Sequence, residues 1–580
     1  MIKLKLRISQ WLASMTRKLR NNFYLYLSAV ISLLILLDAS VFHIGENMRD
    51  RAFDLMVKNR IPALIAKPDK DIIIVDINEA SLSAMAADYG RWPWPRQVFG
   101  EFVENIEAQQ PKAIVFDILF SDPDIYNPDS DAYFNDVIAA TENTYFPMLR
   151  LAPESDHLSE TSPSQIKGLY KAPESTITKP ALKNQATNLA IVLPFFPAVQ
   201  EGGRLGTNNI YQDADGIVRQ YRLWQDHAGW RIPALPLTVG SIDQANMMDY
   251  SETLPQNMLI NWRGKPFSYQ TVSFSDVYTD MASKVKKRAS NEFTNKIVII
   301  GSTAPSLFDV KATAVAKAHP GVEILATAID NVKHTDYLKV WRGKIPYILL
   351  SLMLVWLTAL AFFRNVDRDK LIKLFSFSQI GLLAISFLVI NFTDVYLDLA
   401  GPITWAILYF SIAKIYSLAN ELAMQRILAS NIDKNSHGAG VLLMPISIEN
   451  QDSLSDNLLK KLQQSIKLST RQNVTVDIIK GTQGGIWGLF SDLITVSWTY
   501  PPEDLDAANN AKADAENLGS QINAILQRQG LPNNTIVRYA LHAGAITTDN
   551  ITEDQLSSQW RGLFAQAILK LDVLEKDKTA

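Results

Sequence analysis

Four long apolar segments constrain this chain more than any other feature, because about 20 mostly apolar residues are enough to cross a bilayer as a helix. They cover residues 23–41, 345–363, 371–392 and 400–418. We therefore expect a multi-pass membrane protein with four transmembrane helices. The same segments separate two more polar regions, 42–344 and the stretch after residue 418.

Basic residues predict how these spans are oriented. A basic stretch, residues 1–22, precedes the first span, and the loop between the second and third spans reads RNVDRDK. The loop between the third and fourth spans, TDVYLDLA, has no Lys or Arg. Because basic loops stay in the cytoplasm, both termini are expected inside and residues 42–344 outside. We expect the chain in a bacterial inner membrane, in contact with the lipid bilayer.

The composition excludes several classes of function. A net charge of −3 over 580 residues argues against a nucleic-acid partner, and the length predicts two or more domains. With no cysteine, thiol catalysis, disulfides and cysteine metal sites are excluded. Because no zinc spacing, Walker loop or nucleophile elbow occurs either, we expect neither a metal nor a cofactor.

Residues 71–124 carry the pattern of a β-α-β unit. Two short runs rich in Ile and Val, IIIVD and AIVFD, end on Asp76 and Asp117, and helix-like sequence lies between them. Continuous apolar runs of this length are typical of parallel strands that are buried on both faces. The region 42–344 is therefore predicted to be an α/β domain with a mostly parallel sheet.

In an open parallel sheet, a ligand binds outside the carboxyl ends of the strands. This rule selects six polar residues as a candidate ligand site: Asp76, Glu79, Asp117, Asp122, Ser302 and Thr303. The segment RWPWPR adds residues that are expected to close over a ligand: Arg91, Trp92, Trp94 and Arg96. A structural role stays open, in which the tryptophans plug the sheet edge and the arginines neutralise the two strand-end aspartates.

Seven ordered motifs give this region a family resemblance. They are VDINEASL, RWPWPR, FDILFSDPD, DADGIVR, the pair LINWRG and VSFSDV, KIVIIGSTA, and HPGVEILATAIDN, and they extend from about Arg49 to Lys339. Together they resemble the type 2 CHASE domain, a family of sensory extracellular domains associated with cyclases and histidine kinases. The resemblance implies one span before the domain and about three after it. It also implies an extracytoplasmic ligand or protein partner, which the sequence does not identify.

The region after the fourth span is predicted to be a linker helix, 419–439, and an α+β domain, 440–580. Apolar residues at heptad-like spacing near the fourth span fit either a helical dimer seam or an ordinary amphipathic connector, and with the seam we expect a homodimer. The domain reads as a strand (GVLLMPISI), a helix (454–471), a β-hairpin (474–490), a helix (505–529), a strand (TIVRYALHAGAI) and a final helix (560–575).

The order of these elements, with IWGLF and YALHAGAI, resembles the class III nucleotide cyclase domain. The resemblance implies two metal-binding aspartates and a transition-state Asn and Arg. At the aligned positions this chain has Pro445 and Gly484, then Gln566 and Lys570. Neither Pro445 nor Gly484 has a side chain that binds a metal, so the resemblance implies a degenerate cyclase domain.

Three functions follow from these expectations. The favoured one is a receptor that passes an extracytoplasmic signal to a cytoplasmic signalling partner through a catalytically silent domain. An active adenylate cyclase is the alternative, with Asp477 and Asp492 as displaced metal ligands. The third is a structural membrane scaffold, which the sequence hardly separates from a receptor.

Overall fold

The computed structural model describes residues 23–42, 45–172, 188–341, 343–364, 368–429, 438–449, 456–470, 474–479, 493–531 and 536–547, and seven residues between 559 and 570. It divides into two compact units. The sheet unit comprises Phe42–Tyr347 and Ser376–Gly401. The terminal unit comprises Met1–Val41, Ile348–Phe375 and Pro402–Ala580.

A seven-stranded sheet organises the sheet unit, with strand order β11-β1-β12-β2-β3-β5 and with β6 paired to β3. Every neighbouring pair is parallel except β3 with β5. The mostly parallel sheet predicted from the sequence is therefore confirmed. The strands are β1 (Ile72–Asp76), β2 (Ala113–Phe116), β3 (Thr144–Arg150), β5 (Ile191–Val192), β6 (Leu205–Thr207), β11 (Gln270–Ser273) and β12 (Ile297–Gly301).

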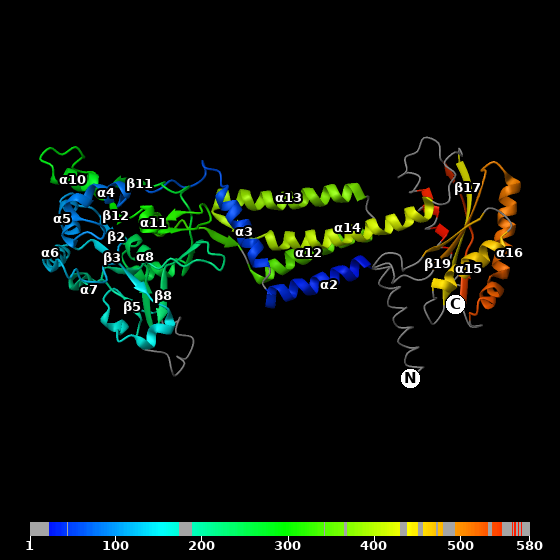
Figure 1. The fold of residues 1–580 in the computed structure, drawn as a ribbon, viewed down its shortest axis with the longest axis horizontal. Helices are drawn as coiled ribbons and strands as arrows, with labels where there is room; N and C mark the ends of the chain where they lie inside the picture. The colour runs from blue at the N-terminus through cyan, green and yellow to red at the C-terminus, as the bar shows by residue number, and fades with distance from the viewer. Residues whose placement is uncertain are drawn as a thin grey trace. The chain divides into compact units, whose positions relative to one another are not determined.

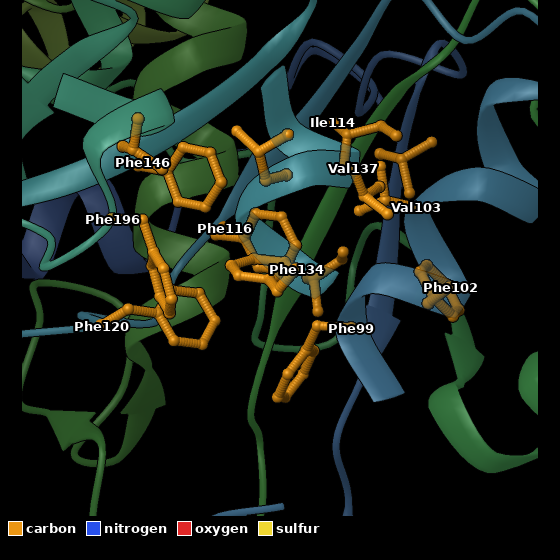
Figure 2. Close-up of a cluster of buried hydrophobic side chains, with 14 of the residues drawn as sticks. Phe99, Phe102, Val103, Ile114, Phe116, Phe120, Phe134, Val137, Phe146 and Phe196 are labelled. Carbon is orange, nitrogen blue, oxygen red and sulfur yellow. The ribbon is translucent and has the colours of Figure 1, made fainter. Parts of the chain in front are cut away.

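Helices cover both faces of this sheet (Figure 1). On one face a large apolar core includes residues of α4 (Glu79–Tyr89), α5 (Arg96–Glu107), α6 (Pro128–Ala139) and α10 (Phe274–Ala282). Figure 2 shows the phenylalanines of this core, among them Phe99, Phe116 and Phe134. The opposite face packs against α8 (Leu235–Gly240) and α11 (Gly321–His334). Because both faces are buried, successive residues of the central strands are all apolar.

A second apolar core in the sheet unit joins segments from distant parts of the chain. It contains Phe53 and Met56 of α3 (Gly45–Lys58), Trp262 and Leu338, and also Ile390 and Tyr396. Strand β15 (Lys339–Trp341) pairs in parallel with β16 (Val395–Leu397) beside it. The segment between the third and fourth apolar helices is thus an integral part of the sheet unit.

Four long helices correspond to the predicted spans: α2 (Phe23–Leu37, continued by a short π-helix, Asp38–Phe42), α12 (Lys344–Phe363), α13 (Arg368–Thr393) and α14 (Ala400–Ala429). Among the described residues, three stretches are helices long and apolar enough to cross a membrane: Phe23–Phe42, Lys344–Phe363 and Asp369–Thr393. Helix α14 is not one of these three, so a fourth span remains a prediction.

The helices of the terminal unit contact one another through polar and aromatic groups. The Trp356 indole N–H donates to Ser32 Oγ at 3.1 Å, and the Tyr409 hydroxyl donates to the Tyr24 carbonyl at 3.0 Å. The rings of Phe375 and Phe410 stack at 4.1 Å between centroids. These contacts link α12 to α2, α14 to α2, and α13 to α14.

The C-terminal part forms an antiparallel sheet of five strands, of order β18-β19-β17-β20 with β21 also paired to β17. Its elements are β17 (Gly438–Glu449), α15 (Asp456–Ser469), β18 (Val474–Ile479), β19 (Leu493–Tyr500), α16 (Leu505–Arg528), β20 (Ile536–Tyr539) and β21 (His542–Thr547). This is a split β-α-β arrangement of the ferredoxin-like type. The partner of β18 is Leu493–Tyr500, later in the chain than the predicted hairpin, and IWGLF lies outside the described residues.

Candidate functional site

Strand β1 delivers Asp76 to the carboxyl edge of the sheet, next to the end of β12. The side chain is 4 % exposed, and its two carboxylate oxygens accept hydrogen bonds from Thr303. The backbone N–H lies at 2.8 Å and the hydroxyl at 2.6 Å. Ser302 donates to the carbonyl of Ile77, just after β1, at 2.8 Å, and accepts from the Ala304 amide of its own turn at 3.0 Å. The Asp76 carboxylate therefore takes up the Thr303 backbone N–H, which is then not available to a bound anion.

Strand β2 delivers Asp117 to the same edge, where polar groups from other segments meet it. The Asn208 amide donates to the Asp117 carboxylate, and the buried Tyr221 hydroxyl donates to Asn208 Oδ1 at 2.8 Å. Asp309, from the turn after β12, is the other carboxyl that acts electrostatically on Asp117. We call Asp76, Asp117, Asn208, Tyr221 and Asp309 the strand-end cluster.

The carboxyls of this cluster hold their protons more tightly than ordinary side chains. Burial, with the negative charge of Asp309 adding to it, raises the pKa of Asp117 to about 8, although the Asn208 amide opposes the shift. Burial also raises the pKa of Asp309, against the attraction of Lys311. The pKa of Asp76 is raised by burial and by the charge of Glu323, and its bonds to Thr303 compensate only partly. Strongly perturbed carboxyls in one place are typical of functional sites.

Helix α11 begins beside this cluster because two glycines leave room for its first turn. A Cβ on Gly301 would lie 2.6 Å from Val322 and 3.0 Å from the Asp117 Cβ. A Cβ on Gly321 would collide with the Asp309 carboxylate. Either side chain would force the start of α11 away from the strand ends. The two glycines therefore hold α11 in direct contact with the cluster.

Glu323, in the first turn of α11, is 2 % exposed and fully engaged. It accepts from the Phe267 amide at 2.5 Å and the Ser268 amide at 2.8 Å, and His319 lies 3.5 Å away. Burial raises the pKa of this carboxyl, but His319 and the two amides outweigh it and hold the pKa below its ordinary value. Glu323 is therefore a charged anchor for the neighbouring loop.

Trp94 is the one residue of the segment RWPWPR that is buried, while Trp92, Pro95 and Arg96 are half-buried and Arg91 and Pro93 are exposed. Trp94 is fully buried and packs against Phe274 at 5.3 Å between ring centroids, with Trp92 at 5.1 Å. Arg96 lies over the Phe120 ring at 5.2 Å and donates to the Trp94 carbonyl at 3.2 Å, whereas Arg91 is exposed. Ion pairs between these two arginines and Asp76 or Asp117 are absent from the described residues. The structural alternative expected Arg91 and Arg96 to neutralise the strand-end aspartates. In the structure they do not do so.

Two predicted site residues lie at the exposed periphery. Glu79 is exposed and accepts from the Ser306 amide at 2.9 Å, which ties α4 to the turn after β12. Asp122 is exposed and accepts from Ser121 in its own loop at 2.7 Å. Neither strand-end aspartate caps α4, because the Asn78 side chain does so by accepting from the Ser81 amide at 2.8 Å. The structure thus brings together Asp76, Asp117, Ser302 and Thr303 from the predicted set.

Sequence reasoning did not find Asn208, Tyr221, Asp309, Gly321 or Glu323 as site residues. Two of them stand within the motif HPGVEILATAIDN, and Asn208 precedes DADGIVR, so their motifs were visible but their spatial convergence was not. Groups of three or more metal-ligating side chains do not occur among the described residues. The cluster is instead suited to groups that donate hydrogen bonds or carry positive charge, because its acceptors are carboxyl and amide oxygens.

The cyclase-related positions are only partly described. Pro445 lies in β17 opposite Thr495 of β19, and Asp477 of β18 pairs with the same Thr495. Gln566 and Lys570 are both exposed, and the Lys570 ammonium donates to the Leu541 carbonyl at 3.5 Å. Gly484 and Asp492 lie outside the described residues.

Comparison with known families gives one result. The model of the CHASE2 domain matches residues 28–362, which is more than half of the chain. The match covers all of the region 42–344 and continues into α2 and α12 on either side of it. No curated protein and no solved structure matches the chain.

Proposed function

The chain belongs to the CHASE2 domain family, and on that basis we propose that it is a membrane receptor that senses an extracytoplasmic signal through the strand-end cluster. The family match carries the sensory role. The matched residues include the sheet region together with parts of the flanking apolar helices α2 and α12. Three helices that are long and apolar enough to cross a membrane support a membrane location.

Two features favour the strand-end cluster as the place where the signal acts. It lies at the carboxyl edge of a parallel sheet, where ligands of such folds bind. It also places Asp309 close enough to Asp117 for the charge of Asp309 to add to the raised pKa of Asp117, which is due first to burial. A cationic or hydrogen-bond-donating ligand relieves this repulsion, which gives the cluster two states of different charge. A purely structural sheet edge has no need of such a pair.

We place the sheet unit outside the inner membrane and both termini in the cytoplasm, following the basic loops. Four spans, with α14 as the last, satisfy this topology. The C-terminal domain then faces the cytoplasm and acts on a signalling partner as a degenerate cyclase-like domain. Its split β-α-β order and the proline at position 445 support this role.

A chimaeric receptor tests the proposal against a structural scaffold. Residues 1–429 are fused to an active adenylate cyclase catalytic domain, and cyclic AMP is measured in membranes. Asp117→Asn and Asp309→Asn are expected to change the output by about fivefold or more, a typical coupling between two sites. Asp243→Asn is the matched control, because the Asp243 side chain is 55 % exposed and forms an ion pair with Lys112. Equal output from all variants, at equal expression, would favour the scaffold.

An active cyclase is the second candidate, and one observation favours it. Asp477 and Pro445 share Thr495 as register partner on the strand between them, so they stand in one row of the sheet, about 10 Å apart. An aspartate thus stands in the same row of the sheet as the position of the missing first metal ligand, two strands away. Cyclic AMP formation by the full chain with Mg²⁺ or Mn²⁺ that disappears in Asp477→Ala would establish this alternative.

A further inference from the structure

The segment between α13 and α14 is attached to the sheet unit by backbone bonds. Strands β15 and β16 align Lys339 with Val395 and Trp341 with Leu397, and the Lys339 amide donates to the Asp394 carbonyl at 2.9 Å. On the helix side, Ser386 Oγ donates to the Leu397 carbonyl at 2.7 Å. The segment is therefore bonded to β15 on one side and to α13 on the other.

A single arginine joins this segment to the interior of the sheet unit. The Arg60 guanidinium, whose side chain is 2 % exposed, donates to Asp394 Oδ1 at 2.5 Å and to Asn261 Oδ1 at 2.7 Å. The next residue repeats the link, because the Ile61 amide donates to Asn391 Oδ1 at 2.7 Å. Asp394 itself is 42 % exposed. A buried cation thus holds a carboxylate that sits on the loop between two apolar helices.

Asn261 continues this link to the far end of α11. The Asn261 backbone N–H donates to Asn331 Oδ1 at 2.8 Å, and the Asn331 side-chain amide donates back to the Asn261 backbone carbonyl at 3.1 Å. Next to it, Asp330 accepts from Arg263 at 2.7 and 3.0 Å. Both side chains of this ion pair are no more than 2 % exposed. The C-terminal turns of α11 are therefore bonded rigidly into the Arg60 link.

Helix α11 consequently connects two places. Its first turn packs against Gly301 and the Asp309 carboxylate of the strand-end cluster, and its last turns bind Asn261, which binds Arg60. A buried helix of 14 residues is about 21 Å long and moves as one piece. A displacement at its first turn therefore reaches its last turn.

We propose that Arg60 is the transmission contact of this receptor, clamping Asp394 so that movements of α11 at the strand-end cluster pass to the loop that joins α13 and α14. This inference deepens the proposed function and rests on it for the identity of the signal. The clamp itself is a property of the sheet unit. The apolar contact between Phe53 and Tyr396, 5.3 Å between ring centroids, keeps the loop docked, and the Arg60 bond sets its position.

Hydrogen–deuterium exchange of the full chain in lipid nanodiscs tests the clamp in both directions, because coupling between two sites is reciprocal. Asp309→Asn perturbs the cluster, Asp394→Asn perturbs the loop, and the double variant completes the cycle. We expect Asp309→Asn to change exchange in residues 390–399, and Asp394→Asn to change it in residues 321–334, each by about fivefold or more. The double variant is expected to be non-additive.

Two controls separate the clamp from general destabilisation. Asp394→Glu keeps a carboxylate for Arg60 and is expected to give wild-type exchange at α11. Asp88→Asn, at an exposed position of α4, is expected to leave both segments unchanged. Effects confined to the neighbourhood of each substitution would overturn the clamp. Reciprocal exchange effects without any change in the chimaeric receptor's output would instead overturn the proposed function and leave the clamp standing.

Discussion

Asp117→Asn is expected to stabilise the protein at alkaline pH, which is unusual for a substitution at a strand end. The carboxyl has a pKa near 3.8 when unperturbed and about 8 in the folded chain. Well below pH 4 the carboxyl is protonated in both the folded and the unfolded state and does not change the free energy of unfolding. Between pH 4 and pH 8 the unfolded chain releases the proton while the folded chain retains it, so stability falls as the pH rises. Above pH 8 the carboxyl is ionised in both states, and the decrease in stability has reached its full size.

The size of this loss follows from the two pKa values. A tenfold difference in acidity corresponds to about 1.4 kcal/mol, so a pKa raised from 3.8 to about 8 sets a limit of about 6 kcal/mol. Because the residue keeps part of its surface in water, we expect about 2–4 kcal/mol. Asparagine keeps the shape and still accepts the bond from Asn208, but it never ionises.

Thermal unfolding of the full chain in nanodiscs measures the effect at pH 4.5 and pH 8.5, with Asp243→Asn as the control. At pH 4.5, less than one unit above the unfolded pKa of 3.8, the variant should melt only slightly above the wild type, by about 1 kcal/mol or less. At pH 8.5 the variant should melt higher, since 1 kcal/mol moves Tm by roughly 2–4 °C in a domain of this size. A variant that melts lower than wild type at pH 8.5 would refute the reasoning and show that the charged carboxylate is a structural partner.

Three further predictions concern other parts of the molecule. Asp330→Ala removes the buried one of the two carboxylates that pair with Arg263. Because Asp336 still pairs with Arg263, the change should cost about 1–3 kcal/mol, seen as a lower Tm, whereas an unchanged Tm would mean that the pair is not buried in solution. Gly321→Ala should displace the Asp309 carboxylate and lower the pKa of Asp117 toward its ordinary value, which a reduced slope of stability against pH would reveal. The full chain should form no measurable cyclic AMP with Mg²⁺ or Mn²⁺, and robust activity would show that other carboxylates replace the missing ligands.

The sequence predicted the parallel sheet because its signal is local. Apolar runs such as IIIVD and AIVF form central strands, and β1 ends on Asp76 while Asp117 directly follows β2. The same logic placed Thr303 beside Asp76, since strand ends of one parallel sheet share an edge. Apolar length likewise predicted the long helices near residues 23, 344 and 368.

Long-range partners were beyond such reasoning. Asn208 reaches Asp117 across 91 positions, and Arg60 reaches Asp394 across 334, so neither pair has any local signature. The tryptophans of RWPWPR show a second kind of error, in which a local pattern was assigned the wrong role. Aromatic and basic residues in a proline-rich loop suggested a lid, yet Trp94 fills the core, where its large apolar surface is best buried.

The docking of residues 390–396 also changes how the sensor domain should be isolated. Ile390 and Tyr396 belong to its second core, so a fragment from Arg49 to Lys339 lacks part of its own interior. Losing buried aromatic and aliphatic side chains of this kind typically costs several kcal/mol, of the order of 2–5 for each. The full chain is therefore the proper material for every measurement above.

The most direct test of the receptor account is the side of the membrane on which each polar region lies. The chain has no cysteine, so single cysteines at two exposed positions, Tyr126→Cys (86 % exposed) and Leu505→Cys (78 % exposed), can be labelled without background. A membrane-impermeant maleimide applied to intact spheroplasts should label Tyr126→Cys at once and Leu505→Cys only after lysis. Labelling of both positions before lysis, or of neither, would contradict a sensor domain outside the membrane and an output domain inside it.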